Sequence, residues 1–469
     1  MSIATTNPAT GTTLKDFPAF DAAKVEACVD RAHRAFAEWR RTPLERRIAI
    51  VRRAGVLLDE RRDEYGRLMT LEMGKLFTAA RDEAGKCALA CRYYADEGPR
   101  ILADEQVATD GERGYVAFHP LGVVLAVMPW NFPFWQVIRF AAPALVAGNT
   151  ALLKHASNVP QCALAIETLF RDAGAPPGVF QALLIGSDAV APLLADPRIA
   201  AVSLTGSEGA GSSVGALAGR YLKPSVLELG GSDPFIVMPS ATLDAAVETA
   251  VRARIINNGQ SCIAAKRFLV HERVADEFEE RFVAAFRGLR IGDPMLPETQ
   301  VGPLATAQIV DDLERQVRES VAAGARVLTG GNRIGRAGFF FEPTVLADVT
   351  PRAPAYHEEL FGPVASVLRV RDAAEAIRIA NDTKFGLGSA VWTTEAHEAL
   401  RFANELEAGT VFVNGMVSSD PRFPFGGVKA SGYGRELAAY GLREFVNVKT
   451  VRMFALDGER APARGTGTE

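Results

Sequence analysis

Apolar positions in the first hundred residues recur at the spacing of a helix. In residues 22–40, one helical face would carry Val25, Cys28, Val29, Ala32, Phe36 and Trp39. A second helix is expected to begin at Thr42, because threonine is a favourable N-cap, Pro43 suits the first helical position and Glu45 completes a capping box. The pattern therefore predicts a helical first third of the chain.

From residue 121 the pattern changes to short apolar runs separated by helix-like stretches. Runs that are apolar at consecutive positions are typical of buried parallel strands, and they cover 121–128, 150–154, 181–186, 200–206 and 225–231. Repeated strand–helix–strand units predict an α/β fold with a doubly wound parallel sheet. Ligands of such sheets bind at the carboxyl ends of the strands.

A second α/β series begins near Pro234, so we place a domain boundary there. Two further strand-like segments belong to neither series. The resulting division is a first unit of 1–110 and 121–231, a second unit of 232–445, outlying strands at 111–120 and 446–455, and a flexible Gly/Pro-rich tail at 456–469.

Composition excludes several classes of protein. The chain has 469 residues, 48% hydrophobic and 23% charged, which is typical of a globular protein. A net charge of −4 argues against a dedicated nucleic-acid binder. No apolar stretch is long enough to span a bilayer, and the first residues lack the features of a signal peptide. We therefore expect a cytoplasmic protein that binds neither nucleic acid nor membrane.

The five cysteines are too few and too scattered for a disulfide framework. No zinc-binding spacing of Cys or His is present, so no metal is expected. Cys262 lies in NNGQSCIAAKR, where Gly259 suits a tight turn. A lone cysteine is more often a buried apolar residue than a nucleophile, but its place in a loop after a predicted helix makes it a catalytic candidate.

Two polar residues in apolar surroundings are further candidates. Glu228 lies in the strand-like SVLELGG: in an apolar cleft its pKa would rise and it could act as a general base, whereas at an exposed strand end it would only be solvated. Asn131 follows the first buried strand in PWNFP, where its amide could stabilise an oxyanion or only bind its own turn.

A cofactor site is indicated only weakly, since no G-x-G-x-x-G follows a strand. Gly206 and Ser207 open a helix after a strand, and backbone N–H groups at such a helix start can bind a pyrophosphate. Lys154, at the end of another strand, could reach a ribose. Together the candidates suit aldehyde oxidation, in which a thiolate adds to the carbonyl, hydride leaves to a nicotinamide, and activated water hydrolyses the thioester.

The chain resembles the aldehyde dehydrogenase family over essentially its whole length. The motifs that carry the resemblance are PWNFP (129–133), LLKHAS (152–157), LTGSEGAG (204–211), LELGGSDP (227–234), GQSC (259–262), EELFGPV (358–364) and PFGGVKASGYGRE (424–436). Each motif alone is moderate support, but seven in the order of the family make chance agreement very improbable.

The resemblance implies a role for each matching residue. Cys262 would be the nucleophile, Glu228 the general base, and Asn131 with the Cys262 N–H the oxyanion hole. The positions implied for the cofactor are Trp130, Lys154, Ser157, Gly206, Ser207 and Leu229, with Glu359 on the nicotinamide ribose and Phe361 near the nicotinamide. The family fold implies that the first unit binds the dinucleotide, the second is catalytic, and the outlying strands form an oligomerisation flap in a homodimer or homotetramer.

Within the family, the chain most resembles bacterial succinate semialdehyde dehydrogenases. Many of these have an arginine six residues before the nucleophile that binds the substrate carboxylate, where this chain has Ile256. Arg139 matches a second carboxylate-binding arginine, and Ser419 and Arg422 lie on the loop that usually lines the substrate funnel. We therefore predict that Arg139, with Arg422, supplies the positive charge for the substrate; a structural ion pair and a solvated loop are the alternatives.

Ser157 bears on the choice of cofactor. Relatives dedicated to NAD often have Glu at this position, which repels a 2′-phosphate, whereas Ser157 is neutral and Lys154 is positive. NADP is therefore expected to be accepted along with, or in preference to, NAD. The alternatives are a dehydrogenase of glutarate semialdehyde or an uncharged aldehyde, a CoA-acylating enzyme, a cysteine hydrolase, and a non-catalytic protein that keeps the fold.

Overall fold

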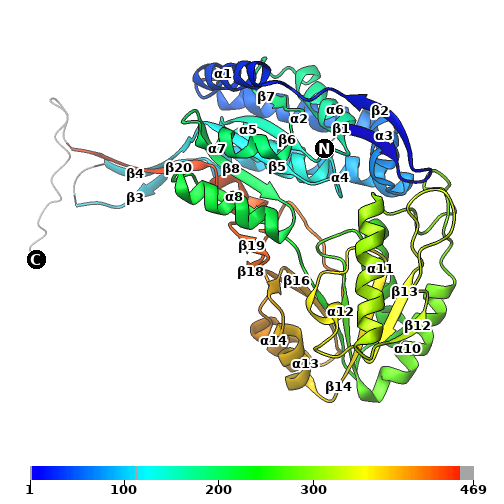
Figure 1. Ribbon diagram of the computed structural model, residues 1–469. Helices are drawn as coiled ribbons and strands as arrows, with labels where there is room; N and C mark the ends of the chain where they lie inside the picture. Colours follow the sequence, from blue (N-terminus) through cyan, green and yellow to red (C-terminus); the bar gives the residue numbers. More distant parts are fainter. Residues whose placement is uncertain (1–2, 111–112, 455–469) are drawn as a thin grey trace, which may run out of the picture.

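The computed structural model describes residues 3–110 and 113–454, and its core is organised around two sheets (Figure 1). The first sheet has the order β19-β9-β8-β5-β6-β7. Its parallel strands are β5 (Val123–Met128), β6 (Thr150–His155), β7 (Phe180–Ala182), β8 (Ile199–Thr205) and β9 (Ser225–Glu228). β19 (Gly432–Tyr433) adds antiparallel to β9.

Helices cover both faces of this sheet, because its strands are apolar on both sides. Val124 and Ala126 face one layer, whereas Val123 and Leu125 face the other. The first layer contains α2 (Leu44–Glu60), α3 (Arg62–Met73), α4 (Phe77–Ile101), α5 (Trp135–Ala147) and α6 (Pro160–Asp172). The second contains α1 (Ala22–Trp39), α7 (Val190–Ala195) and α8 (Glu208–Arg220). The predicted doubly wound arrangement is confirmed.

The predicted start of the second helix is wrong. Helix α2 begins at Leu44, Pro43 stands at its N-cap, and no side chain caps it. Thr42 instead donates its hydroxyl to the carbonyl of Glu38, in the last turn of α1 (3.2 Å). The short connection between the two helices therefore uses the threonine to close α1 rather than to start α2.

The second sheet has the order β12-β13-β14-β11-β10-β16-β17. Its parallel strands are β10 (Pro234–Val237), β11 (Arg267–His271), β13 (Thr344–Ala347), β14 (Val364–Val370), β16 (Gly388–Trp392) and β17 (Thr410–Val413). β12 (Arg326–Thr329) is antiparallel to β13 and forms one edge. A second α/β unit is therefore present, as the pattern predicted.

Helices also cover both faces of the second sheet. One side packs α9 (Leu243–Ile255) and α10 (Glu272–Arg287) over an aromatic core that includes Phe235, Phe268 and Phe278. The other side packs α11 (Ala307–Ala322), α12 (Pro354–His357), α13 (Ala373–Asn381) and α14 (Ala396–Glu405). No helix within the described ranges has both the length and the apolarity to cross a membrane.

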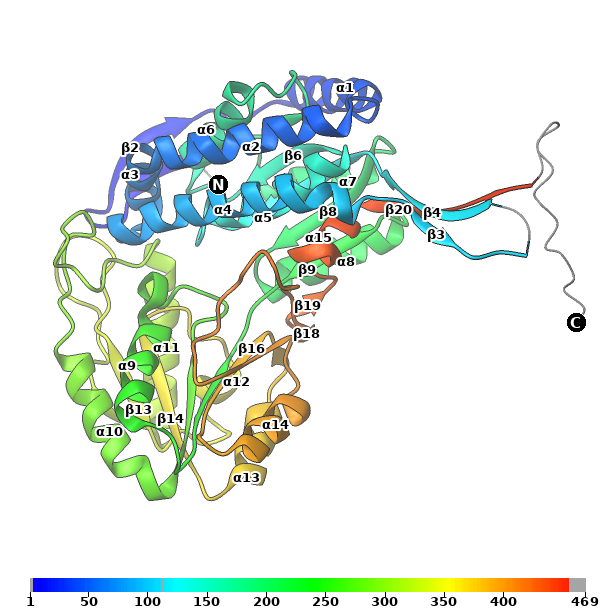
Figure 2. The same ribbon diagram turned by 180° about the vertical axis from the view of Figure 1, so that it is seen from behind.

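A three-stranded flap projects from the body (Figures 1 and 2). β3 (Glu105–Val107) and β20 (Val446–Met453) both pair antiparallel with β4 (Arg113–Pro120), and β20 matches β4 along its whole length. The two outlying strands thus pair as expected, although their role in oligomerisation stays a prediction. The predicted flexible tail at 456–469 lies outside the described residues.

Several short elements were not predicted. β1 (Ile3–Asn7) and β2 (Thr12–Phe17) form a hairpin, and β15 (Phe385–Gly386) pairs with β18 (Val428–Lys429). After β18 the chain returns to the first unit, where β19 extends the first sheet and α15 (Ala438–Arg443) packs on α5. The predicted domain boundaries remain predictions, and residues 424–445 join the two units (Figure 2).

Candidate active site

A pocket of about 280 Å³ lies at the carboxyl ends of β5, β8 and β9, the position expected for ligands of a parallel sheet. Its lining residues are Pro129, Trp130, Asn131, Gln136, Thr205, Gly206, Ser207, Leu229, Gly230, Cys262, Glu359 and Phe361. They come from both α/β units, so the pocket is formed only when the two units pack together.

The pocket brings most of the predicted site residues together. Eight of them line it: Trp130, Asn131, Gly206, Ser207, Leu229, Cys262, Glu359 and Phe361. The rings of Trp130 and Phe361 meet edge to face, with centroids 5.7 Å apart. The predicted residues outside the lining are Arg139, Lys154, Ser157, Glu228, Ser419 and Arg422.

The backbone before Cys262 follows an unusual path. Helix α9 gives way to a 3-10 turn, η2 (Ile256–Gly259), in which Asn257, Asn258 and Gly259 have φ of 54°, 57° and 79°. A Cβ on Gly259 would lie 2.3 Å from the backbone of Gly362, so only glycine fits there. This left-handed run turns the chain out of the helix and presents Cys262 to the pocket.

Buried polar groups hold this turn in place. Asn257 donates its amide to the carbonyl of Asn131 (2.7 Å), which ties the turn to the loop after β5. Asn258 donates to the carbonyl of Gly74 (3.0 Å). Arg254 donates to the carbonyls of Gly259 (2.6 Å) and, more weakly, Leu360 (3.4 Å). The turn is therefore positioned by three separate segments of the chain.

Cys262 is a thiol in a low-dielectric setting. Burial raises its pKa to about 12, while the positive charges of Lys266 and Arg139 act in the opposite direction. The other four cysteines, Cys28, Cys87, Cys91 and Cys162, are buried in the helical layers. Cys262 is thus the cysteine that faces the pocket, and nearby cations favour its thiolate.

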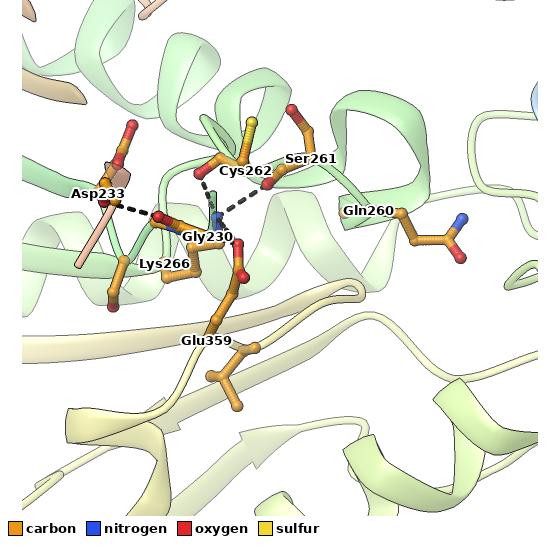
Figure 3. Close-up of polar contacts among 12 residues, drawn as sticks. Gly230, Asp233, Gln260, Ser261, Cys262, Lys266 and Glu359 are labelled. Carbon is orange, nitrogen blue, oxygen red and sulfur yellow. Dashed lines mark hydrogen bonds and ion pairs between the residues drawn. The ribbon is translucent and has the colours of Figure 1, made fainter. Parts of the chain in front are cut away.

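Lys266 connects the nucleophile loop to Glu359 (Figure 3). Its Nζ donates to the carbonyls of Ser261 (2.8 Å) and Cys262 (2.6 Å) and pairs with the carboxylate of Glu359 (3.2 Å). An ammonium has three donors, and these three acceptors use all of them. The Cys262 sulfur points away from Lys266 (Figure 3), which leaves the sulfur free for the pocket.

Asn131 lies in the pocket beside the loop that carries Cys262. Its Nδ2 donates to the carbonyl of Gln260 (3.2 Å), two residues before Cys262. The same amide nitrogen carries a second hydrogen, and both Asn131 and Cys262 line the pocket. This arrangement supports the predicted pairing of the two residues around one reacting carbon.

Glu228 is fully buried at the end of β9 and does not line the pocket. Burial, followed by the neighbouring Glu436 carboxylate, raises its pKa well above the ordinary value of a glutamate. Its Oε1 lies against Gly426, where a Cβ would be only 2.7 Å away. Glu228 is therefore buried rather than solvated at an exposed strand end, and charged groups such as Glu436 and Arg139 lie near it. To act on a ligand of Cys262, the carboxyl must rotate out of this position.

The surroundings of helix α8 fit the phosphates of a dinucleotide. Ser207 is the N-cap of α8 and accepts from the N–H of Ala210 (3.3 Å), and Gly206 precedes it in the pocket wall. Leu229 closes the wall beside the helix. Lys154 stands at the carboxyl end of β6, where partial burial lowers its pKa, and in the described residues its Nζ makes no ion pair. These residues fit a nicotinamide dinucleotide.

Arg139 is not free to bind a substrate in this structure. It is 2% exposed, forms a buried ion pair with Glu436, and donates to the hydroxyl of Thr205 (3.2 Å). Its guanidinium also lies over the ring of Phe425. The structural ion pair considered as an alternative is the observed contact, so the carboxylate-binding role stays a prediction that these contacts do not favour.

The two candidates on the 417–423 loop differ. Arg422 is exposed and pairs with Asp420 two residues away (2.6 Å), which is the solvated-loop arrangement considered as its alternative. Ser419 is largely buried and accepts a hydrogen bond from Lys86 of α4 (2.7 Å). Of the two, only Ser419 connects the loop to the body of the first unit.

Sequence reasoning missed Lys266, Lys86 and Gln136. The available signal was a lysine in apolar surroundings, since a cation there needs partners. Lys266 starts the apolar strand KRFLVH, and Lys86 lies among the apolar residues of α4. Gln136 lines the pocket, and its buried Oε1 has no hydrogen-bond partner among the residues that the structure describes. Across residues 3–110 and 113–454, no cluster of His, Cys, Asp and Glu could hold a metal ion.

The fold and the pocket define a dehydrogenase-like α/β enzyme, and the comparisons identify its family. The aldehyde dehydrogenase family model matches residues 1–451, and the chain belongs to this family. "Succinate-semialdehyde dehydrogenase [NADP(+)] 1" of Mycobacterium tuberculosis is 55% identical over 454 residues, covering 96% of this chain and 99% of the relative. "Probable succinate-semialdehyde dehydrogenase [NADP(+)]" of Synechocystis is 54% identical over 451 residues, with the same coverage.

Solved structures agree with this assignment. Succinic semialdehyde dehydrogenase from Streptococcus pyogenes, in complex with NADP+ as the cofactor, superposes with a TM-score of 0.94 at 39% identity, covering 96% of this chain and 99% of the other. Succinate-semialdehyde dehydrogenase from Burkholderia pseudomallei superposes with a TM-score of 0.93 at 36% identity, covering 97% and 94%. The predicted family and fold class are confirmed.

Proposed function

We propose that this chain is an NADP-accepting succinate semialdehyde dehydrogenase. The observation that carries the proposal is the pocket in which Cys262, Asn131 and Glu359 meet the N-terminus of α8. Relatives with the same named activity match nearly the whole chain at 54–55% identity, which supports both the substrate and the cofactor.

The residues around Cys262 perform the chemistry in sequence. The Cys262 thiol first loses its proton to water, the thiolate adds to the aldehyde carbon, and the Asn131 amide with the Cys262 N–H donates to the resulting oxyanion. A bound nicotinamide dinucleotide supplies the hydride acceptor when present. Loss of hydride leaves a thioester on Cys262, and Glu228 takes a proton from the water that hydrolyses it. Cys262 is thereby returned for the next turnover.

The cofactor residues are assigned by position. Lys154 and Ser157 face the adenosine ribose, with Ser157 permitting a 2′-phosphate, while Glu359 holds the nicotinamide ribose and Phe361 packs near the nicotinamide. Support comes from the neutral Ser157 and from the positive charge of Lys154, which suit a phosphate. The Streptococcus pyogenes structure that resembles this chain contains NADP+.

Two rival chemistries have less support. A CoA-acylating enzyme needs no hydrolytic base, whereas Glu228 is retained here. A cysteine hydrolase needs a histidine beside the thiol, and no histidine is among the residues that line the described pocket. We further propose a cytoplasmic homodimer or homotetramer in which the strands β4 and β20 of the flap contact another copy.

Initial rates of nicotinamide reduction test the proposal. Succinate semialdehyde, glutarate semialdehyde and butanal are compared with NAD and NADP in parallel. The expected result is the highest kcat/KM for succinate semialdehyde with NADP. A higher kcat/KM for butanal would refute the assigned substrate, and no turnover of any aldehyde would favour a non-catalytic protein.

A further inference from the structure

We infer that Lys86 of helix α4 binds the carboxylate of the aldehyde substrate. The inference rests on the function proposed above and concerns a residue to which the motifs assigned no role. It starts from an unusual feature of Lys86: this lysine is partly buried, yet it has no acidic partner within 4.0 Å in the described part of the chain.

Lys86 is held in a fixed position. Its Nζ donates to the hydroxyl of Ser419 (2.7 Å) and lies 4.4 Å from the centroid of the Trp135 ring. Trp135 is the first residue of α5, and the next residue, Gln136, lines the pocket with Cys262. Lys86 lies just outside the pocket lining, between the 417–423 loop and the start of α5, the helix that contributes Gln136 to the pocket wall.

The packing of α4 on α5 fixes this geometry. Glu83, nearly one turn before Lys86, accepts from the backbone N–H groups of Phe134 and Trp135 (2.9 Å each). Glu83 also forms a buried ion pair with Lys75. A carboxylate at the N-terminus of a helix is favourably placed. The lysine is therefore on a rigid support rather than on a mobile loop.

The acidic groups closest to Lys86 already have other partners. Glu83 is engaged by Lys75 and by the start of α5, and Asp420 is engaged by Arg422. Glu436, on the far side of Arg139, is engaged by that arginine. In the described residues Lys86 therefore keeps a positive charge that no carboxylate neutralises, as Lys154 does on the side of the pocket proposed for the cofactor. An incoming carboxylate provides this neutralisation.

The surroundings of Lys86 also lower the pKa of its ammonium group. Burial lowers the pKa of Lys86 to about 8, and the positive charge of Arg139 acts in the same direction. The other titratable groups near Lys86 come from three segments: Glu83 and Cys87 from α4, Lys75 from the residues before α4, and Asp420 from the 417–423 loop. Lys86 is mainly protonated at pH 7 and becomes neutral above pH 8, so its affinity for a carboxylate falls there.

The same arrangement accounts for Ser419. The hydroxyl that accepts from Lys86 can also donate a hydrogen bond to a carboxylate, so lysine and serine form one binding site for a small anion. The resemblance implies an arginine for the substrate carboxylate six residues before the nucleophile, but this chain has Ile256 there, so a positive charge has to come from elsewhere. Arg139 is paired with Glu436 in this structure, which leaves Lys86 as the cation for the carboxylate.

The test compares wild type with Lys86→Met, Lys86→Arg and Lys24→Met, using succinate semialdehyde and butanal. Methionine keeps the length and the apolar packing of the lysine stem. Lys24 is the matched control, because it also lies over an aromatic ring (Phe20, 3.6 Å) but belongs to α1 on the other face of the sheet. KM and kcat are measured separately for each substrate.

A charge-assisted hydrogen bond to the carboxylate predicts that Lys86→Met raises KM for succinate semialdehyde about 10- to 100-fold. The kcat should change little, butanal kinetics should not worsen, and Lys86→Arg should restore part of the affinity. In wild type, kcat/KM for succinate semialdehyde divided by kcat/KM for butanal should fall above pH 8, because Lys86 loses its charge there. The ionisation of Cys262 affects both substrates equally and cancels in this ratio.

Different failures have different meanings. A wild-type preference for succinate semialdehyde that survives Lys86→Met would overturn the inference and leave the proposed function standing. An equal loss for both aldehydes would show that Lys86 only supports the fold, which also overturns it. If the wild-type enzyme had an equal or higher kcat/KM for butanal than for succinate semialdehyde, the proposed substrate would be refuted and, with it, this role of Lys86.

Discussion

Replacing Lys266 with methionine should make Cys262 a much weaker nucleophile. Lys266 Nζ is 2.6 Å from the carbonyl oxygen of Cys262. The sulfur of the same residue then lies within about 7 Å of the ammonium, given ordinary bond lengths. At an effective dielectric constant of about 20, this separation corresponds to about 2 kcal/mol, or between one and two pKa units for the thiol.

The assay is the rate of Cys262 alkylation by iodoacetamide at pH 8, where the rate follows the small thiolate fraction because the thiol pKa is near 12. We expect Lys266→Met to alkylate about 10- to 50-fold more slowly than wild type. Turnover should fall in parallel. The Cys262→Ser variant measures the background alkylation of the other four, buried cysteines, which is subtracted.

Lys429→Met is the matched control for this experiment. Lys429 also donates to two backbone carbonyls, Asn381 (2.9 Å) and Thr383 (3.4 Å), and pairs with Glu407, but none of its partners belongs to the Cys262 loop. It should leave alkylation unchanged. If folded Lys266→Met protein, verified by circular dichroism, were alkylated as fast as wild type, the argument that the buried ammonium favours the thiolate would be wrong.

Three further changes test other parts of the site. Glu228→Gln should still release about one equivalent of reduced cofactor per site in a rapid burst, while steady-state turnover falls about 10²- to 10⁴-fold; loss of the burst would show that Glu228 acts before hydrolysis. Ser157→Glu should raise KM for NADP about tenfold or more and change KM for NAD little, as judged by initial rates; an unchanged KM for NADP would contradict the position assigned to Ser157. Gly259→Ala should lower the melting temperature and activity together, because φ is 79° and the added Cβ meets Gly362 at 2.3 Å, a cost of about 2–4 kcal/mol; an unchanged melting temperature would show that the turn can relax.

Local sequence predicted the elements whose stability is local. The apolar run 121–128 became β5, and the run 200–206 became β8 (Ile199–Thr205), because a strand buried on both faces must be apolar at every position. The predicted start of α2 was wrong because the Thr42 hydroxyl could bond either the end of α1 or the start of α2, and it bonds the Glu38 carbonyl of α1. Short-range patterns do not decide between two nearby acceptors.

The site shows the same division. Motifs alone selected Cys262, Asn131 and Glu359, and the structure brings all three to one pocket. They did not show that Arg139 would meet Glu436, a residue almost 300 positions later, and so be engaged before any substrate arrives. The charge state and the availability of a side chain depend on its partners, which the motif does not contain.

The sequence by itself therefore determined the family, the order of the main strands and helices, and the residue types that carry the chemistry, because these follow from apolar periodicity and from short motifs. Only the tertiary structure decided which cations are neutralised and which remain available. Lys86 and Ser419 are 333 positions apart and meet only after α4, α5 and the late loop have packed. Burial and pairing are properties of that packing, and they set both the pKa of a group and its capacity to bind a ligand.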